Sequence, residues 1–131
     1  MRYSATLLAA AFIATVEYAQ ALTVSGGDAT VFDPSTGACG FFNTGDDFVV
    51  GIDFFSFSSV PIAGVSTTPH RSPLCGRQMV VSAPGDKTVT ATIVDVCSGC
   101  RKGSVVLSPA AFDQIITSDV DLVEGISWTV V

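Results

Sequence analysis

The stretch Thr92-Ile93-Val94-Asp95-Val96-Cys97-Ser98-Gly99-Cys100, followed by Val105-Val106-Leu107-Ser108-Pro109-Ala110-Ala111-Phe112, is the most specific part of this chain. It continues a segment, from residue 87 to residue 93, in which apolar residues alternate with threonines. That period of two is typical of a half-buried strand. Asp95 keeps the parity of the apolar residues, so its carboxylate is predicted to point toward the core where the strand ends.

The second half of the stretch predicts a turn and then a helix. Ser98-Gly99 is a turn-forming pair between two cysteines. Ser108 is a favourable N-cap, and Pro109 suits the first helical position because its missing N–H costs nothing there. The helix is predicted to run from residue 109 to about residue 117, with a buried face formed by Phe112, Ile115 and Ile116.

The rest of the chain predicts short strands and turns. Strands are expected at residues 29–32, 48–52, 78–81 and 126–130, with Trp128 in the core. Residues 54–57 (Phe-Phe-Ser-Phe) form either a buried strand or an exposed aromatic platform, and a place in the core is favoured. Five or six short strands with one helix predict a small closed barrel.

One long connection, at residues 58–73, is predicted to be irregular. It contains His70, the single histidine, next to Arg71. A catalytic histidine would need a nucleophile or an acid beside it, and none can be placed there. A solvated pair on a loop is therefore the favoured interpretation.

The first 21 residues have the pattern of a secretory signal peptide. Arg2 precedes an apolar run at residues 7–16, and Ala19-Gln20-Ala21 matches a cleavage site. The run is too short to span a bilayer as a helix. We therefore expect a secreted protein whose residues 22–131 form a single domain.

Charge and cysteine content narrow the classes of partner. The net charge is −6, and losing Arg2 and Glu17 with the leader leaves it unchanged. An acidic chain without a basic patch argues against nucleic acid and anionic membranes as partners. Four cysteines in an oxidising compartment favour two disulfides over a zinc site or a redox-active dithiol, and four cysteines allow three pairings.

Five ordered motifs carry a family resemblance that spans nearly all of residues 22–131. They are Gly37-Ala38-Cys39-Gly40, Pro73-Leu74-Cys75-Gly76, the 94–100 segment, the 107–112 segment and Gly125-Ile126-Ser127-Trp128. Together they resemble the double-psi β-barrel of the rare-lipoprotein-A-like and barwin-like group, and most closely the small fungal expansin-like proteins called loosenins. The resemblance implies a mainly β, six-stranded barrel with one or two short helices and a carbohydrate-binding groove. It also implies the pairing Cys39–Cys75 with Cys97–Cys100.

The chain departs from the family pattern at two functional positions. Relatives carry Thr-x-Tyr in the first strand, where this chain has Thr30-Val31-Phe32. Relatives also carry Asp-Leu-Ser before the helix, where this chain has Val106 in place of the acid. In the lytic relatives that acid is the general acid, and a valine cannot donate a proton. Asp33 lies near the position of a second carboxylate in the cellulase relatives, and hydrolysis normally needs two placed carboxyl groups.

These observations predict a secreted, non-hydrolytic protein of the expansin type that needs no cofactor and acts as a monomer. It would bind a cell-wall polysaccharide of the cellulose or chitin type through a groove containing Thr30, Phe32, Asp33 and Asp95. Asp95 has an alternative interpretation as a structural acid that accepts backbone N–H groups around the Cys97–Cys100 turn. A second hypothesis is a secreted effector or protease inhibitor that binds a host or secreted protein. A glycoside hydrolase or lytic transglycosylase is the least favoured.

Overall fold

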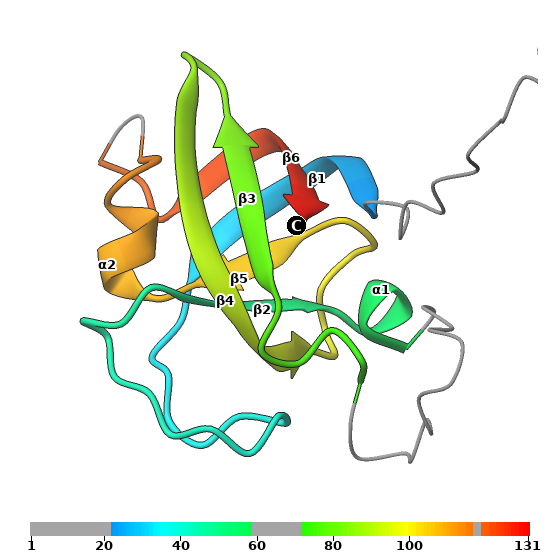
Figure 1. Cartoon of the computed structure of the whole chain (residues 1–131). Helices are drawn as coiled ribbons and strands as arrows, with labels where there is room; N and C mark the ends of the chain where they lie inside the picture. Colours follow the sequence, from blue (N-terminus) through cyan, green and yellow to red (C-terminus); the bar gives the residue numbers. More distant parts are fainter. Residues whose placement is uncertain (1–21, 59–71, 117–118) are drawn as a thin grey trace, which may run out of the picture.

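Six strands close into a barrel in the computed structural model, which describes residues 22–58, 72–116 and 119–131 (Figure 1). The order around the barrel is β1-β5-β2-β4-β3-β6. The elements are β1 (Thr23–Val31), β2 (Val49–Asp53), α1 (Phe54–Ser58), β3 (Gln78–Ala83), β4 (Lys87–Cys97), β5 (Val105–Leu107), α2 (Pro109–Phe112) and β6 (Leu122–Val130). The predicted fold class, a mainly β six-stranded barrel with short helices, is confirmed.

Two of the six strand pairs are parallel. β1 runs parallel to β5 and β2 runs parallel to β4, while the other four pairs are antiparallel. A parallel neighbour needs a crossover rather than a tight turn. β5 also separates β1 from β2 in the barrel, so the chain between β1 and β2 has to cross β5, and this connection builds part of the surface described below.

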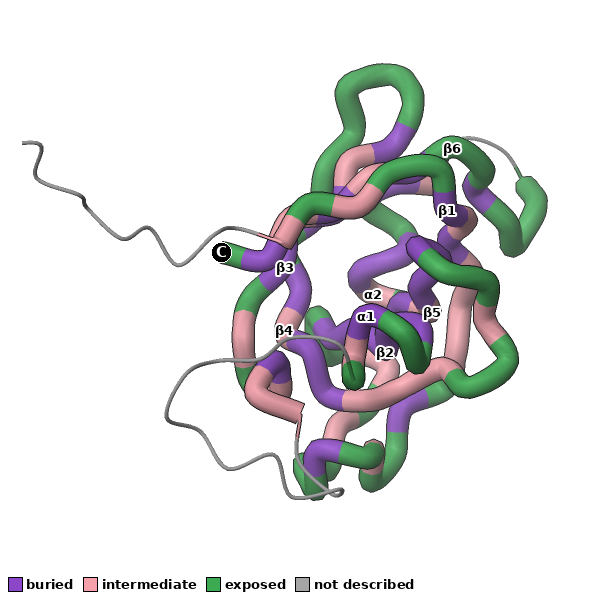
Figure 2. Tube along the Cα trace, turned by 90° about the vertical axis from the view of Figure 1, so that its right-hand side faces the viewer, coloured by how far each residue is buried: buried purple, intermediate pink, exposed green. Residues whose placement is uncertain are grey.

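The barrel interior is filled by alternate side chains of all six strands. In the view of Figure 2 the strands form a ring along which buried segments alternate with more exposed ones. The largest fully buried apolar side chains are Trp128, Ile52, Met79, Ile93, Leu107, Ile115 and Ile126. Trp128 was predicted in the core, and its indole N–H donates to the Gly103 carbonyl at 3.0 Å. The aromatic ring is thus buried with its polar atom satisfied.

The first strand is longer than predicted. β1 begins at Thr23, and residues 23–28 pair with β6, with register shifts on either side of Gly27. Residues 23–28 contain two glycines and three polar residues, so they lack the alternating apolar pattern of a strand. The sequence therefore did not predict this half of β1, because glycine and aspartate are depleted in strands.

The helix after β5 is shorter than predicted, although its start is correct. Ser108 caps it by accepting from the Ala111 N–H, and Pro109 occupies the first turn. α2 ends at Phe112 and continues as a turn in which the Ile115 N–H donates to the Phe112 carbonyl at 3.0 Å. Phe112 and Ile115 are buried, and Ile116 is half-buried against the core. The predicted apolar face therefore forms, although the helix itself is only four residues long.

The prediction that residues 54–57 lie in the core is wrong for Phe54 and Phe55 only. The segment lies in the short helix α1, in which Phe54 is 54% exposed and Phe55 is 60% exposed, whereas Ser56 is buried and Phe57 is half-buried against the core. Asp53 caps the helix, with its Oδ1 accepting from the Ser56 N–H at 2.9 Å. Because this cap starts a helix, β2 ends at Asp53 and the following residues do not continue as a strand.

Some sequence predictions fall outside the described residues. They are the signal peptide at residues 1–21, most of the 58–73 connection with His70 and Arg71, and the predicted last helical residue, Thr117. Within the described residues, no helix has both the length and the apolarity needed to cross a membrane.

Candidate binding surface

A row of four residues crosses the outer face of the barrel over four neighbouring strands. Thr30 of β1 pairs with Val106 of β5, Val106 with Gly51 of β2, and Gly51 with Asp95 of β4. The chain neighbours of Val106 and Gly51 all belong to the core, so these two positions face outward. We call Thr30, Val106, Gly51 and Asp95 the outer row.

Gly51 is buried beneath its neighbours in the middle of the outer row. A Cβ at this position would lie 2.8 Å from Val106 Cγ2 and 3.5 Å from Asp95 Cβ. The first distance is too short for a real Cβ, so a larger residue here would have to displace the Val106 side chain. The side chains of Val106 and Asp95 therefore stand next to each other, with no side chain between them.

The prediction that Asp95 points toward the core is wrong. The register of β2 against β4 shifts by one residue between the pairs Val50↔Ile93 and Gly51↔Asp95. The extra residue, Val94, is a β-bulge, and a bulge reverses the side on which the following residues emerge. Asp95 therefore lies on the outer face, half-buried, next to Gly51.

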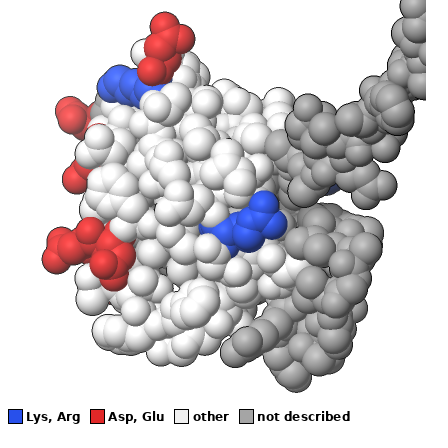
Figure 3. Space-filling model, viewed as in Figure 1, with Lys and Arg blue, Asp and Glu red and all other residues white. Residues whose placement is uncertain are grey.

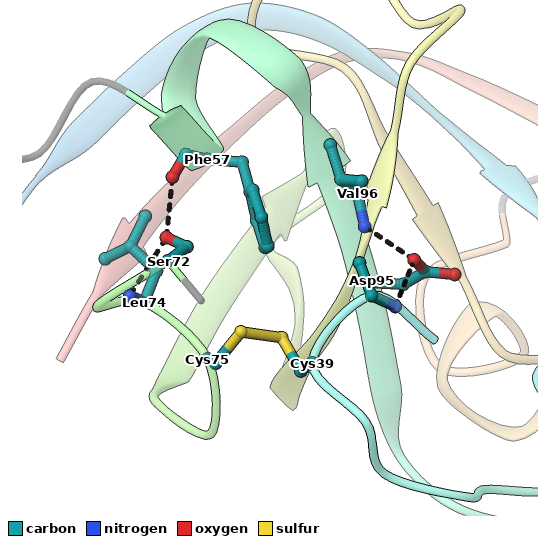
Figure 4. The surroundings of a disulfide bond; sticks show 8 residues. Cys39, Phe57, Ser72, Leu74, Cys75, Asp95 and Val96 are labelled. Carbon is teal, nitrogen blue, oxygen red and sulfur yellow. Dashed lines mark hydrogen bonds between the residues drawn. A yellow bond between two sulfur atoms is a disulfide. The ribbon is translucent and has the colours of Figure 1, made fainter. Parts of the chain in front are cut away.

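The carboxylate of Asp95 has a structural role on this outer face. Its Oδ1 accepts from the Ala38 N–H at 2.9 Å and from the Val96 N–H at 2.8 Å (Figure 4). Its Oδ2 has no hydrogen-bond partner among the described residues. One oxygen therefore holds the backbone and the other remains for a ligand.

The chain between β1 and β2 folds into a small hairpin, residues 35–43, which lies against β4. An antiparallel bridge joins Thr36 to Phe42, and the Cys39 N–H donates to the Val94 carbonyl at 3.1 Å. Gly37 approaches β4 so closely that a Cβ there would lie 2.5 Å from the Val94 oxygen. Ala38 and Cys39, at the tip of this 35–43 hairpin, are thereby placed over the bulge.

Both disulfides that the resemblance implies are formed. Cys39–Cys75 ties the tip of the 35–43 hairpin to the segment before β3, and Cys97–Cys100 closes the turn after β4. Figure 4 shows the first of them near Asp95. All four cysteines are used, and none is free. The preference for disulfides over a zinc site or a dithiol is therefore confirmed.

The structure places two of the predicted groove residues, Thr30 and Asp95, at opposite ends of the outer row. Phe32 continues the pairing of β1 with β5, since its N–H donates to the Leu107 carbonyl at 2.9 Å, and it is half-buried. Asp33 lies beyond the end of β1 and is exposed. The row thus has a hydroxyl at one end and a carboxylate at the other, with a valine in place of the family's acid.

Sequence reasoning missed a hollow beside the 35–43 hairpin. It has a volume of about 780 Å³ and lies over the start of β2 and the middle of β4. Its lining residues are Gly40, Phe41, Phe42, Asn43, Asp47, Phe48, Val49, Gly76, Thr92 and Val94. We call it the aromatic hollow. The face seen in Figure 3 has acidic groups at its left edge and at its top, basic side chains near its top and its centre, and otherwise uncharged surface.

Sequence reasoning also missed the most buried carboxylate described, Asp53, which is 0% exposed. Its Oδ2 accepts from the Ser56 hydroxyl at 2.8 Å and from the Gly103 N–H at 3.0 Å. The sequence did carry a signal, because aspartate is one of the residues favoured at the N-cap of a helix. Asp53 is enclosed by protein groups and is a structural residue.

Solved structures share this barrel. The Streptomyces papain inhibitor aligns with a TM-score of 0.67 and 28% identity over 84% of this chain and 94% of its own. A Clavibacter michiganensis expansin in complex with cellohexaose aligns with a TM-score of 0.64 and 23% identity over 84% of this chain and 50% of its own. The chain has the double-psi β-barrel fold of the expansin-like and barwin-like group.

Curated proteins match this double-psi β-barrel over part of their length. A homologue of the allergen Asp f 7 from Arthroderma benhamiae is 28% identical over 117 residues, which cover 78% of this chain and 37% of that protein. The papain inhibitor of Streptomyces mobaraensis is 31% identical over 71 residues, which cover 53% of this chain and 50% of that protein. This chain therefore spans half or less of the curated relatives that it matches. No family model matches it.

Proposed function

We propose that this double-psi β-barrel is a secreted protein that binds a neutral cell-wall polysaccharide across the outer row without cleaving it. The observation that carries the proposal is the row itself, a strip over four strands with Thr30 and the free Oδ2 of Asp95 at its ends. Sugar hydroxyls can donate to Oδ2 and exchange hydrogen bonds with the threonine. Gly51 has no side chain, so nothing projects between Val106 and Asp95 to obstruct a flat chain.

The centre of the outer row supports binding without hydrolysis. Val106 stands between Thr30 and Gly51, where the family's lytic members carry an acid. Without a proton donor at this position, general-acid assistance of about 10²–10⁴-fold is lost. Asp95 is a poor substitute, because one of its oxygens is occupied by two backbone N–H groups.

Secretion is supported by the cysteines and the leader. Two disulfides that use every cysteine suit an oxidising compartment, since cytosolic proteins rarely keep such bonds. The leader pattern at residues 1–21 would deliver the chain to such a compartment.

Retention on insoluble cellulose and chitin tests this proposal. We expect the mature protein to be retained, and we expect Asp95→Asn to weaken retention by about 5–10-fold, because a charge-assisted hydrogen bond is lost. Asn keeps an oxygen for the Ala38 and Val96 N–H groups, so the melting temperature should change little. Asp86→Asn, at an exposed site in the turn between β3 and β4 and away from the row, is the matched control. No reducing sugar should be released above a blank.

Two results would contradict the proposal. The first is equal retention of the Asp95→Asn variant and the native protein. The second is reproducible sugar release that Asp95→Asn abolishes, which would make Asp95 an acid of an enzyme.

A second candidate function is inhibition of a cysteine protease. It is favoured by the likeness to the Streptomyces papain inhibitor, which this chain matches over 94% of that structure, against 50% for the expansin. Titration of papain with the mature protein, run beside the polysaccharide assay, separates the two candidates. Inhibition with no retention on cellulose or chitin would replace the first proposal by the second.

A further inference from the structure

The aromatic hollow exposes three phenylalanine rings at one site. Phe41, Phe42 and Phe48 are 45%, 72% and 43% exposed. Val49 and Val94 line the same hollow, together with the polar residues Asn43, Asp47 and Thr92. A cluster of exposed apolar side chains of this kind marks an interaction site rather than ordinary surface.

The backbone that carries Phe41 and Phe42 is held in place before any partner arrives. Phe41 lies about 3.7 Å from where a Cβ on Gly76 would be, and Gly76 directly follows Cys75 of the disulfide. The Phe42 backbone is bridged to Thr36, and the Gly37 N–H donates to the Phe41 carbonyl at 3.3 Å. A surface that is already ordered loses little entropy on binding, which favours affinity.

The polar groups of the hollow are only partly engaged. The Asp47 Oδ2 already accepts from the Thr44 N–H at 2.9 Å and from the Asn43 amide at 3.4 Å. The Asn43 Oδ1 has no partner among the described residues and is buried, so a ligand in the hollow does not reach it. The Asp47 Oδ1 has no hydrogen-bond partner among the described residues and can accept from a donor on a ligand. The hollow therefore presents exposed aromatic rings beside a carboxylate oxygen that is free to accept.

The negative charge at the rim of the hollow favours a cationic group beside the bound apolar group. Asp47 lines the hollow, its neighbour Asp46 is also exposed, and no lining residue is basic. Two carboxylates favour a cation and disfavour anionic lipid head groups. A partner that presents a large apolar side chain next to a Lys or Arg matches both the rings and the charge.

We infer that the aromatic hollow is a docking site for a protein segment that carries a large apolar side chain next to a Lys or Arg. The apolar side chain packs among Phe41, Phe42 and Phe48, and the cation lies by Asp46 and Asp47. Aromatic side chains are enriched in the cores of protein interfaces, and a few of them carry most of the binding energy. This site shares no residue with the outer row. Polysaccharide binding at the outer row therefore neither supports nor contradicts this inference.

Selection from a phage library of random dodecapeptides on the immobilised mature protein tests the inference. We expect enriched peptides to share an aromatic or large aliphatic residue within two positions of a Lys or Arg. The most enriched peptide, made synthetically, should bind the Phe42→Ser variant at least about tenfold more weakly, as is usual for a hot spot. Phe54→Ser removes another exposed ring, 54% exposed and outside the hollow, and should leave the dissociation constant unchanged. Asp46→Asn should weaken binding about twofold to fivefold at low salt and less at high salt.

An amide NMR titration with the same peptide, and separately with cellohexaose, locates each ligand. The peptide should shift the signals of Phe41, Phe42 and Gly76, and the spectrum of Phe42→Ser confirms that this variant is folded. The inference is overturned if no peptide is enriched, if enriched peptides lack the apolar-cationic pair, or if they bind Phe42→Ser as tightly as the native protein. Cellohexaose shifting the signals of the hollow would also overturn it, since the hollow would then be a sugar site.

Discussion

At the scale of the residue, the carboxylate of Asp53 connects helix α1 with the loop before β5. It accepts three hydrogen bonds, two from Ser56 and one from Gly103. In Asp53→Asn an amide NH₂ would face donors, so we expect the free energy of unfolding to fall by about 2–3 kcal/mol. Urea unfolding followed by the fluorescence of Trp128 measures the change, and Asp46→Asn is the exposed control, expected to leave stability unaltered. An Asp53→Asn protein as stable as the native one would show that the three hydrogen bonds are dispensable.

At the scale of the element, β1 and the turn around Gly103 touch backbone to backbone. A Cβ on Gly27 would lie 1.9 Å from the Gly103 oxygen, which also accepts the Trp128 indole N–H. Gly27→Ala must therefore push the turn away from the strand, and we expect a loss of about 3 kcal/mol or a failure to fold. Gly99→Ala is the matched control, because nothing lies within 4 Å of its Cβ. Equal melting temperatures for the two variants would refute this packing.

At the scale of the whole molecule, the two disulfides should differ in their contribution to stability. Cys39–Cys75 spans 36 residues, whereas Cys97–Cys100 spans three. On the chain-entropy model the first stabilises the fold by about 3–4 kcal/mol and the second by about 1.5 kcal/mol. Replacing each pair by alanines and comparing urea midpoints measures both contributions. The ranking would be contradicted if loss of Cys97–Cys100 lowered the free energy of unfolding as much as loss of Cys39–Cys75.

Loss of Cys39–Cys75 should also weaken peptide binding, since that bond anchors the rim of the aromatic hollow.

Local signals in the sequence determined much of the barrel. Alternation marked most of β4 and placed Trp128 in the core, because a strand's side chains emerge on opposite faces in turn. Ser108 and Pro109 marked the start of α2, because capping depends on residues within one turn of each other. The ordered motifs around the four cysteines pointed to the fold and to the disulfide pairing, and both are confirmed.

Only the tertiary structure decided which way Asp95 faces and where the outer row and the aromatic hollow lie. The bulge at Val94 comes from the register of β2 against β4, strands about 40 residues apart in the chain, and no local pattern reports such a register. The first half of β1 is a strand because β6 pairs with it. The aromatic hollow is assembled from the 35–43 hairpin, the start of β2, the segment after Cys75 and the middle of β4. Its phenylalanines stay exposed because the interior is already filled by residues of the strands, and that competition for space is settled only when the barrel closes.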